Sequence, residues 1–342
     1  MSDHLCGRFV AVALCVIVGL TAAPGCALAA EQGGKEKNKV RVERVNFHGW
    51  RQAYLLTNGE TDVVFVPQVA RIMKYAPTGG ENMLWINEMI LPERPVESKM
   101  EGWQNYGGYK LWPAPQRNWG WPPPPALDGG ECSVQVGEDG ALTVTGQASE
   151  DCGIRFDRRI ELAPEGSRLQ VRQTMVNVSD NPVTWAIWDV TQVSTRGVGF
   201  IPLAPGAECR FASLDEGNEH WTLLDNMLLA RRVEGSDKVF VSGPPGCIGS
   251  VEDGLLYLKT FDMPKQAPPQ PEAVREIYVG DIGYMELEVV GPEVTLQPGE
   301  SASLTEVWRL LPFQEKPKSD KELANLIQQK IEPVLAAEPQ PK

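Results

Sequence analysis

Short runs in which apolar and polar residues alternate, or in which β-branched residues gather, recur along the chain up to residue 310. Such runs are typical of half-buried β-strands, and turns rich in Gly, Pro, Asn and Asp separate them. No long run with helical periodicity occurs before residue 310. The sequence therefore predicts an all-β body of two large, packed antiparallel sheets. Its clearest strands are expected at 60–69, 141–147, 168–178, 238–243, 255–261, 284–291 and 303–310.

The C-terminal segment 319–337 follows a different pattern, in which apolar side chains recur at helical spacing. Ser319 is suited to cap this helix, with Glu322 three residues later in a capping-box pattern. We expect the helix to pack on the body or to hang from it, with a partner-binding role as the alternative. The folded body is expected over residues 40–313, and the helix with a disordered tail over residues 314–342.

The first 29 residues predict an export signal peptide. Arg8 precedes an apolar run over residues 9–20, which is too short to span a membrane, and an Ala-Leu-Ala cleavage site ends at Ala29. Cys26 lies in a loose lipobox, so a lipid anchor at this cysteine is the alternative to free release. Either pathway places the protein in the periplasm or outside the cell, after a flexible lead-in over residues 30–39.

The composition narrows the set of partners. A formal net charge of −13 over 342 residues disfavours nucleic acid and anionic membranes, and the sequence leaves the oligomeric state open. Four cysteines lie outside the export segment, and an even number in an exported protein permits disulfides. We expect Cys132 to pair with Cys152 and Cys209 with Cys247. No Cys/His cluster or calcium loop is present, so no metal or organic cofactor is expected.

Residues 104–125 carry the densest group of aromatic rings on a segment that its prolines and glycines keep irregular. A sugar has apolar C–H faces and polar edges, so rings mixed with a few hydrogen-bonding groups suit a mono- or oligosaccharide. The alternative is that these rings cap the end of the sheet core. The rings are Tyr106, Tyr109, Trp112, Trp119 and Trp121, and the basic residues among them are Lys110 and Arg117.

Three stretches resemble galactose mutarotase-like, or aldose 1-epimerase-like, domains. The first is HGWRQAYLLTNGETDVVFVPQVARIMKYAPTGGENMLWIN at 48–87, and the last is YMELEVVGPEVTLQPGESASLTEVWRL at 284–310. GGYKLWPAPQ at 107–116, followed by WPPPPALDGG at 121–130, is similar to one exported bacterial branch of unknown function. The resemblance covers roughly residues 41–312. It implies a β-supersandwich of two broad antiparallel sheets with a carbohydrate-binding cleft.

The resemblance also implies a chemistry, in which a glutamate base and a histidine acid interconvert sugar anomers. Glu286 and Glu288 stand at the place of the base, and because they are two residues apart they share one face of a strand. The alternative puts both carboxylates on a solvated face. No histidine follows the turn at 179–182, where the resemblance places the acid, and Asp189 is the substitute candidate. His48 and His220, the two histidines beyond the export segment, do not match that position.

Three functions remain from the sequence. The first is an exported carbohydrate-binding protein with its sugar in a Trp-rich cleft, and the second is an epimerase or mutarotase-like isomerase that uses Glu286 or Glu288 with a non-standard acid. The third is a structural or interaction module. A uronate lyase is a weaker option, with a tyrosine base and a neighbouring cation. The expected sugar-binding residues are Arg71, Asn82, Tyr109, Lys110, Trp112, Arg117, Trp119 and Trp121.

Overall fold

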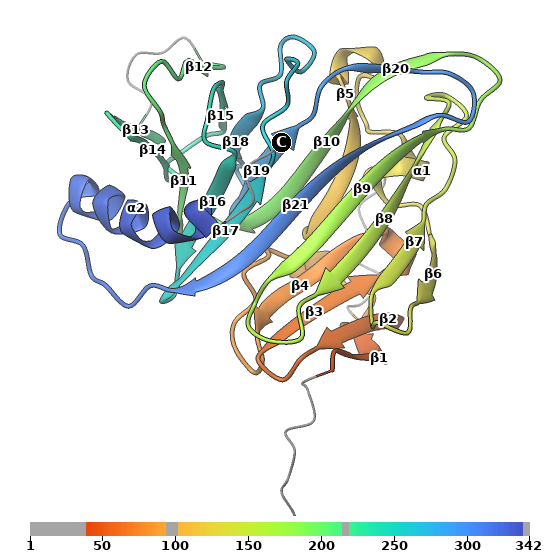
Figure 1. The fold of residues 1–342 in the computed structure, drawn as a ribbon, viewed down its shortest axis with the longest axis horizontal. Helices are drawn as coiled ribbons and strands as arrows, with labels where there is room; N and C mark the ends of the chain where they lie inside the picture. The colour runs from red at the N-terminus through yellow and green to blue at the C-terminus, as the bar shows by residue number, and fades with distance from the viewer. Residues whose placement is uncertain (1–38, 94–101, 214–218, 338–342) are drawn as a thin grey trace, which may run out of the picture. The chain divides into compact units, whose positions relative to one another are not determined.

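Two large antiparallel sheets form the body of the protein in a computed structural model, which describes residues 39–93, 102–213 and 219–337. This confirms the predicted all-β sandwich of two antiparallel sheets with a C-terminal helix (Figure 1). The predicted signal peptide, Cys26 and nearly all of the lead-in lie outside the described residues. None of the helices in the described ranges combines the length and apolar character that crossing a bilayer requires.

The first sheet has eleven strands in the described part of the chain. In spatial order they are β1 (Arg41–Phe47), β2 (Trp50–Thr57), β3 (Thr61–Val66), β4 (Arg71–Pro77), β5 (Tyr109–Ala114), β10 (Val183–Ser194), β19 (Tyr284–Val290), β18 (Arg275–Val279), β15 (Asp237–Val241) and β12 (Cys209–Phe211), with β20 (Val294–Leu296) paired to the start of β10. Strands far apart in the sequence thus become neighbours at its centre.

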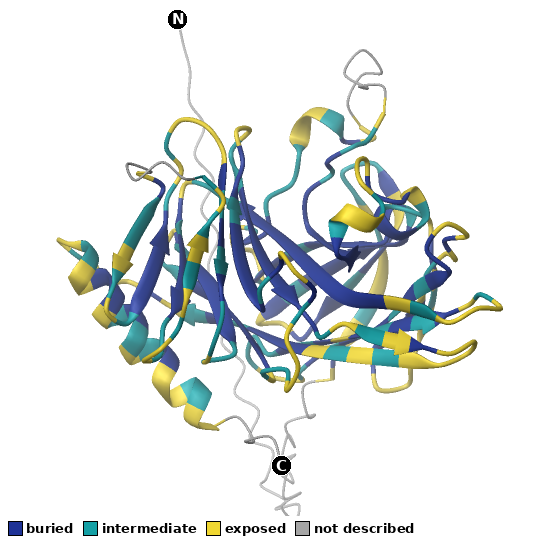
Figure 2. Ribbon diagram, turned by 90° about the horizontal axis from the view of Figure 1, so that it is seen from above, coloured by how far each residue is buried: buried dark blue, intermediate teal, exposed yellow. Residues whose placement is uncertain are grey.

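The second sheet has ten strands, counted over the same described residues. Their order is β13 (Trp221–Leu224), β14 (Met227–Ala230), β11 (Val198–Pro202), β16 (Cys247–Glu252), β17 (Leu255–Phe261), β21 (Ser301–Pro312), β9 (Leu169–Asn177), β8 (Ile154–Leu162), β7 (Leu142–Thr145) and β6 (Ser133–Val136). Strand interiors are buried while most loops are exposed (Figure 2). The main core lies where alternate side chains of the two sheets meet.

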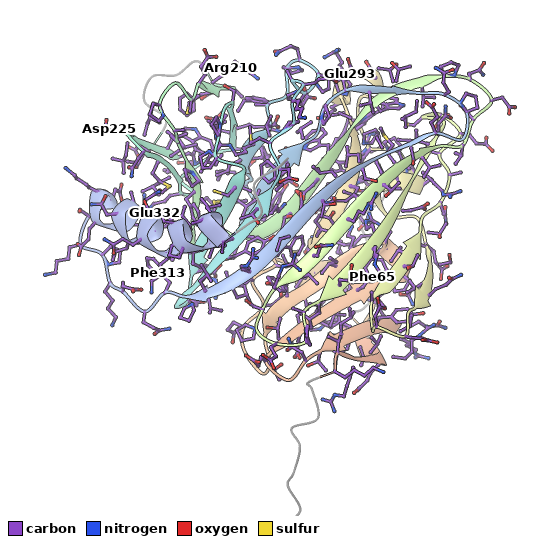
Figure 3. All side chains as sticks on the ribbon, in the orientation of Figure 1. Phe65, Arg210, Asp225, Glu293, Phe313 and Glu332 are labelled. Atoms are coloured by element: carbon purple, nitrogen blue, oxygen red, sulfur yellow. The ribbon has the colours of Figure 1, made fainter. Side chains whose placement is uncertain are left out.

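Helix α2 (Asp320–Ala337) forms where the sequence predicts it and lies against β14 and β17 (Figure 1). The Ser319 hydroxyl accepts a hydrogen bond from the Glu322 backbone N–H over 3.2 Å, as a capping residue does. The apolar side chains of α2 join a second core on the outer surface of the ten-stranded sheet, and Phe313 lies beneath the helix (Figure 3). The helix is therefore packed on the body rather than extended from it.

The four cysteines within the described residues are free thiols, so the expected pairs Cys132–Cys152 and Cys209–Cys247 are not bonded. Cys132 hydrogen-bonds to the Pro67 carbonyl, whereas Cys152 lies in the turn before β8. Cys209 belongs to β12 of the first sheet and Cys247 to β16 of the second. Cys132 and Cys152 share the main core, and Cys209 and Cys247 share Arg275 as a neighbour, but neither pair is bonded.

Candidate functional site

The candidate site lies on the face of the eleven-stranded sheet that points away from the other sheet. On β19 the side chains of Met285, Leu287 and Val289 enter the core between the sheets. Glu286 and Glu288 therefore share the opposite face, as the spacing predicts. They are nevertheless buried, since only 7% and 1% of their surfaces are exposed. Side chains from β5, β10, β15 and the loop after β5 surround them, so this face is not the solvated one.

Two consecutive glycines position β5 within this face. Gly107 and Gly108 have φ angles of 90° and 72°, which side chains rarely tolerate. A Cβ atom on Gly107 would lie 2.4 Å from the Trp85 carbonyl oxygen, and one on Gly108 would lie 2.4 Å from the Ile72 carbonyl oxygen. The Gly107 carbonyl also accepts a hydrogen bond from Arg71 over 2.9 Å. Close backbone packing thus explains the glycine pair that opens GGYKLW.

Glu286 is held by two donors. Lys110 Nζ lies 3.1 Å from Glu286 Oε1, and Gln192 Nε2 donates to the same oxygen over 2.8 Å. The Lys110 ammonium also lies 4.4 Å from the centre of the Trp112 ring. Burial lowers the pKa of Lys110, and the nearby Arg71 guanidinium lowers it further, while Glu286 opposes the shift. The pair is therefore a desolvated ion pair next to an indole.

Glu288 belongs to a second charged group. Its Oε2 accepts hydrogen bonds from Trp188 Nε1 and Lys238 Nζ, each over 2.7 Å, and Lys238 also lies 2.6 Å from Glu276 Oε2. Burial and the neighbouring carboxylates of Glu276 and Glu286 raise the pKa of Glu288 well above its ordinary value, although Lys238 opposes this. Burial alone would lower the pKa of Lys238, but its two carboxylate partners raise it. One lysine thus balances two buried glutamates.

A third group of side chains is centred on Asp128, at the end of the short helix α1 (Pro125–Asp128), and its carboxylate accepts the hydrogen bonds of this group. Arg71 Nη2 donates to both of its oxygens, over 2.9 and 3.0 Å. The indole of Trp103 donates to it over 2.9 Å and that of Trp112 over 2.7 Å. Asp128 therefore fixes two rings of the aromatic face and neutralises the buried Arg71. Asp128 lies in the stretch WPPPPALDGG, but no pattern in that stretch identified its carboxylate as a site residue.

The aromatic rings form one cluster around Trp112. The rings of Trp119, Trp121 and Trp188 meet Trp112 edge to face, at centroid separations of 5.9, 6.4 and 5.4 Å. Trp112 and Trp188 are almost completely buried, whereas 59% of Trp121 is exposed and Trp119 is half-buried. Only the outer rings can therefore stack on a ligand, and the inner ones form the floor beneath them.

A cavity of about 360 Å³ opens beside this cluster. Its wall combines two aromatic rings with basic, acidic and amide side chains, and it reaches the Glu288 group through Trp188 and Lys238. The residues that line it are Gln116, Arg117, Gly120, Trp188, Lys238, Phe240, Pro271 and Glu272. A larger cavity of about 530 Å³ lies near Lys39 and Arg168, away from these charged groups. The smaller cavity is the better candidate because buried ionisable groups adjoin it.

Several predicted site residues lie elsewhere. Asp189 points between the two sheets, where Lys259 binds its carboxylate, so it is on the opposite face of β10 from Trp188. Tyr109 also enters the core, and its hydroxyl accepts from Gln173 over 2.5 Å. Asn82 holds a turn, because its side-chain amide bonds to backbone groups of Met73, Tyr75 and Leu84. The side chains of Asp189, Tyr109 and Asn82 therefore make contacts within the fold and do not line the cavity.

The two histidines of the described chain belong to other parts of the fold. His48 occupies the turn between β1 and β2, where Nδ1 lies 3.0 Å from Glu93 Oε1. His220 precedes β13, and its Nδ1 accepts a hydrogen bond from the Val233 backbone N–H over 3.1 Å. Within residues 39–93, 102–213 and 219–337, no cluster of three or more His, Cys, Asp or Glu side chains is arranged to hold a metal ion.

Solved structures of other proteins have the same fold, among them a galactose mutarotase-like protein. That protein, from Lactobacillus casei, superimposes with a TM-score of 0.52 at 10% identity, covering 76% of this chain and all of that one. The Slr1438 protein of Synechocystis sp. matches with 0.52 at 12% identity, covering 77% and 96%. A TPR-domain containing protein of Parabacteroides distasonis matches with a TM-score of 0.53 at 13% identity. The match covers 79% of this chain and 49% of that protein, so this chain spans about half of that protein's length.

The chain belongs to the family described as Domain of unknown function (DUF4380), whose sequence model matches residues 52–311. This span contains every side chain of the face described above. A search of curated proteins found no match.

Proposed function

We propose that this chain is an exported carbohydrate-binding protein, which holds a mono- or oligosaccharide in the cavity beside the aromatic cluster. The observation that carries the proposal is the composition of the cavity wall. Phe240 offers an apolar ring surface and the almost buried Trp188 contributes to the floor, while Arg117 and Glu272 offer hydrogen-bonding groups. The apolar faces and polar edges of a sugar ring require this combination. The exposed ring of Trp121, next to Gly120 of the wall, extends the apolar surface outward.

Binding without efficient catalysis is favoured by the state of the two glutamates. Glu286 accepts from Lys110 and Gln192, and Glu288 accepts from Trp188 and Lys238. A general base must reach the proton that it removes, with a heavy-atom separation of about 3 Å. One oxygen of each carboxylate is instead occupied by donors of the protein, and both residues are buried.

Isomerase activity is the second candidate, and one observation favours it. Glu288 Oε1 has no hydrogen-bond partner among the described residues, and the pKa of this carboxyl is raised well above its ordinary value. A carboxyl with a raised pKa can exchange a proton near neutral pH. If a ligand displaced Lys238, Glu288 would face the cavity. The rings and carboxylates also fit the third option, a packed structural module, if no sugar binds.

Proton NMR of the purified protein with reducing sugars tests the three functions in one set of spectra. Saturation transfer reports binding, and exchange between the α and β anomers reports turnover. We expect saturation transfer from at least one sugar and anomer exchange no faster than in buffer. Exchange above the buffer rate that is lost in Glu288→Gln, but retained in the matched Glu252→Gln on β16, would establish the isomerase instead. Absence of saturation transfer from every sugar would overturn the carbohydrate proposal.

A further inference from the structure

Glu272 is the acidic residue of the cavity wall that the sequence pattern did not single out. It is 6% exposed and lies between β17 and β18, beside the cavity. Its Oε1 accepts a hydrogen bond from the Gln116 backbone N–H over 3.2 Å. Its Oε2 is buried and has no hydrogen-bond partner within the described part of the chain. A buried carboxylate oxygen without a donor is costly, unless a ligand supplies the missing donor.

Three cations of the face are already balanced by carboxylates. Arg71 is bound by Asp128, and Lys110 by Glu286. Lys238, the lysine on the cavity wall, lies between Glu276 and Glu288. Two exposed arginines also adjoin the cavity, Arg117 in its wall and Arg210 over the Phe240 ring at 3.7 Å. Water and salt screen their charges more than they screen the buried carboxylates. The less exposed charges beside the cavity are thus one lysine, Lys238, against the carboxylates of Glu272, Glu276 and Glu288.

We propose that Glu272 selects the ligand of this cavity, and that the ligand is an uncharged sugar whose hydroxyl donates a hydrogen bond to Glu272 Oε2. The inference rests on the proposed carbohydrate function and adds its substrate class. A neutral hydroxyl supplies the donor that Oε2 lacks without adding charge. A uronate places a second carboxylate beside the first, and like charges in a partly buried site repel. Burial raises the pKa of Glu272, which agrees with a carboxyl that lacks its full set of donors.

Matched pairs of sugars test this selection. Methyl glucoside and methyl galactoside are compared with the corresponding glucuronide and galacturonide, which differ only at C6, by calorimetric titration at pH 8. The alkaline pH favours the ionised form of Glu272, whose pKa burial raises. We expect the better-bound neutral glycoside to bind at least about tenfold more tightly than its uronide, because a misplaced charge costs several-fold or more in affinity.

The Glu272→Gln variant separates the role of this residue from the general shape of the cavity. An amide keeps the size and one acceptor but removes the charge, so neutral-sugar affinity should fall about fivefold while the discrimination against the uronide falls below about threefold. Glu252→Gln serves as the control, because Glu252 is a buried glutamate on the other sheet with its own arginine partner, Arg196, at 2.7 Å. It should leave both affinities unchanged.

The outcomes distinguish this inference from the function on which it rests. If no glycoside of either charge binds, the carbohydrate function itself fails. If uronides bind as tightly as neutral glycosides or more tightly, the carbohydrate function stands but the proposed selection is wrong, and the exposed Arg117 governs the site. If Glu272→Gln changes neither affinity nor discrimination although sugars bind, the assignment of Glu272 is overturned.

Discussion

The indole of Trp188 donates a hydrogen bond to Glu288 Oε2 over 2.7 Å, and both residues lie on the outward face of the eleven-stranded sheet. Lys238, on β15, donates a hydrogen bond to the same oxygen over 2.7 Å. Its ammonium lies 4.6 Å from the centre of the Trp188 ring. Three strands are thus joined at one carboxylate oxygen. The stability of this junction depends on Lys238, since it is the cation that balances both Glu288 and Glu276.

Replacing Lys238 with methionine should destabilise the fold strongly at neutral pH. The change leaves Glu276 and Glu288 buried without their cation, a situation that costs about 3–5 kcal/mol. The loss should shrink as pH falls. A carboxyl whose pKa is higher in the folded state than in the unfolded state costs stability as pH rises from the unfolded pKa to the folded pKa. Lowering the pH to 5 protonates more of this carboxyl and should therefore reduce the loss of stability in the variant. Urea denaturation at pH 7 and at pH 5 measures the free energy of unfolding of the variant and of the unchanged protein.

Lys74→Met is the matched control for that measurement. Lys74 pairs with Asp62 over 3.0 Å, but both side chains are partly exposed. Pairs of this kind contribute about 0–1 kcal/mol. An equal loss in the two variants would contradict the view that the buried glutamates depend on Lys238. Failure of Lys238→Met to gain relative stability at pH 5 would contradict the electrostatic cause.

Replacing Trp121 with alanine should weaken sugar binding without unfolding the protein. Its ring is 59% exposed and meets Trp103 edge to face at 4.8 Å, so its removal opens no core cavity. Loss of one ring from a sugar-binding surface is expected to lower affinity about tenfold, near 1.4 kcal/mol. Calorimetric titration measures the affinity and thermal denaturation the stability. Met89→Ala, another exposed apolar residue, should change neither.

Replacing Asp189 with asparagine should destabilise the fold and leave the sugar affinity of the folded protein unchanged. Its carboxylate binds the fully buried Lys259, whose next acidic neighbour, Glu306, is 3.8 Å away. Removing one member of a buried ion pair costs about 3–5 kcal/mol. The residue lies on the opposite face of β10 from the cavity. A selective loss of affinity with normal stability would return Asp189 to the list of ligand-binding residues.

The sequence predicts the two faces of a strand where apolar and polar residues alternate, because alternation is a local property. The residues 284–291 correctly place Glu286 and Glu288 on one face of β19. The same reasoning could not show that this face is covered, since its cover comes from segments on both sides of β5, where Trp103 precedes the strand and Asp128 follows it. Lys238 lies 50 residues from its partner Glu288. Such partners meet only through the order of the strands, which the chain does not encode in any short pattern.

The direction of β10 shows a second limit. Its run VTWAIWDVTQV contains large apolar residues at nearly every position, so alternation could not decide which side chains face the core. Sequence comparison with mutarotase-like domains drew attention to Asp189 at this place. Its register in the sheet, where Asp189 pairs with Val289 and Leu111, assigns it to the inner face with those two residues. Trp188, on the outer face, is the residue of this run that borders the cavity.

The cysteines give the last prediction, because the free thiols of the described residues differ from the two disulfides that the sequence predicts. Burial raises the pKa of Cys132 to about 11 and that of Cys247 to about 12. At pH 8 a thiol with a pKa of 11 is ionised to about one part in a thousand, so it reacts slowly with Ellman's reagent. We expect slow reaction in the native state and four reactive thiols from residues 30–342 in guanidinium without reductant. Cys209→Ser should remove the fastest native phase, since Cys209 is only half-buried. Two or no thiols in guanidinium would restore the disulfides that the sequence suggested.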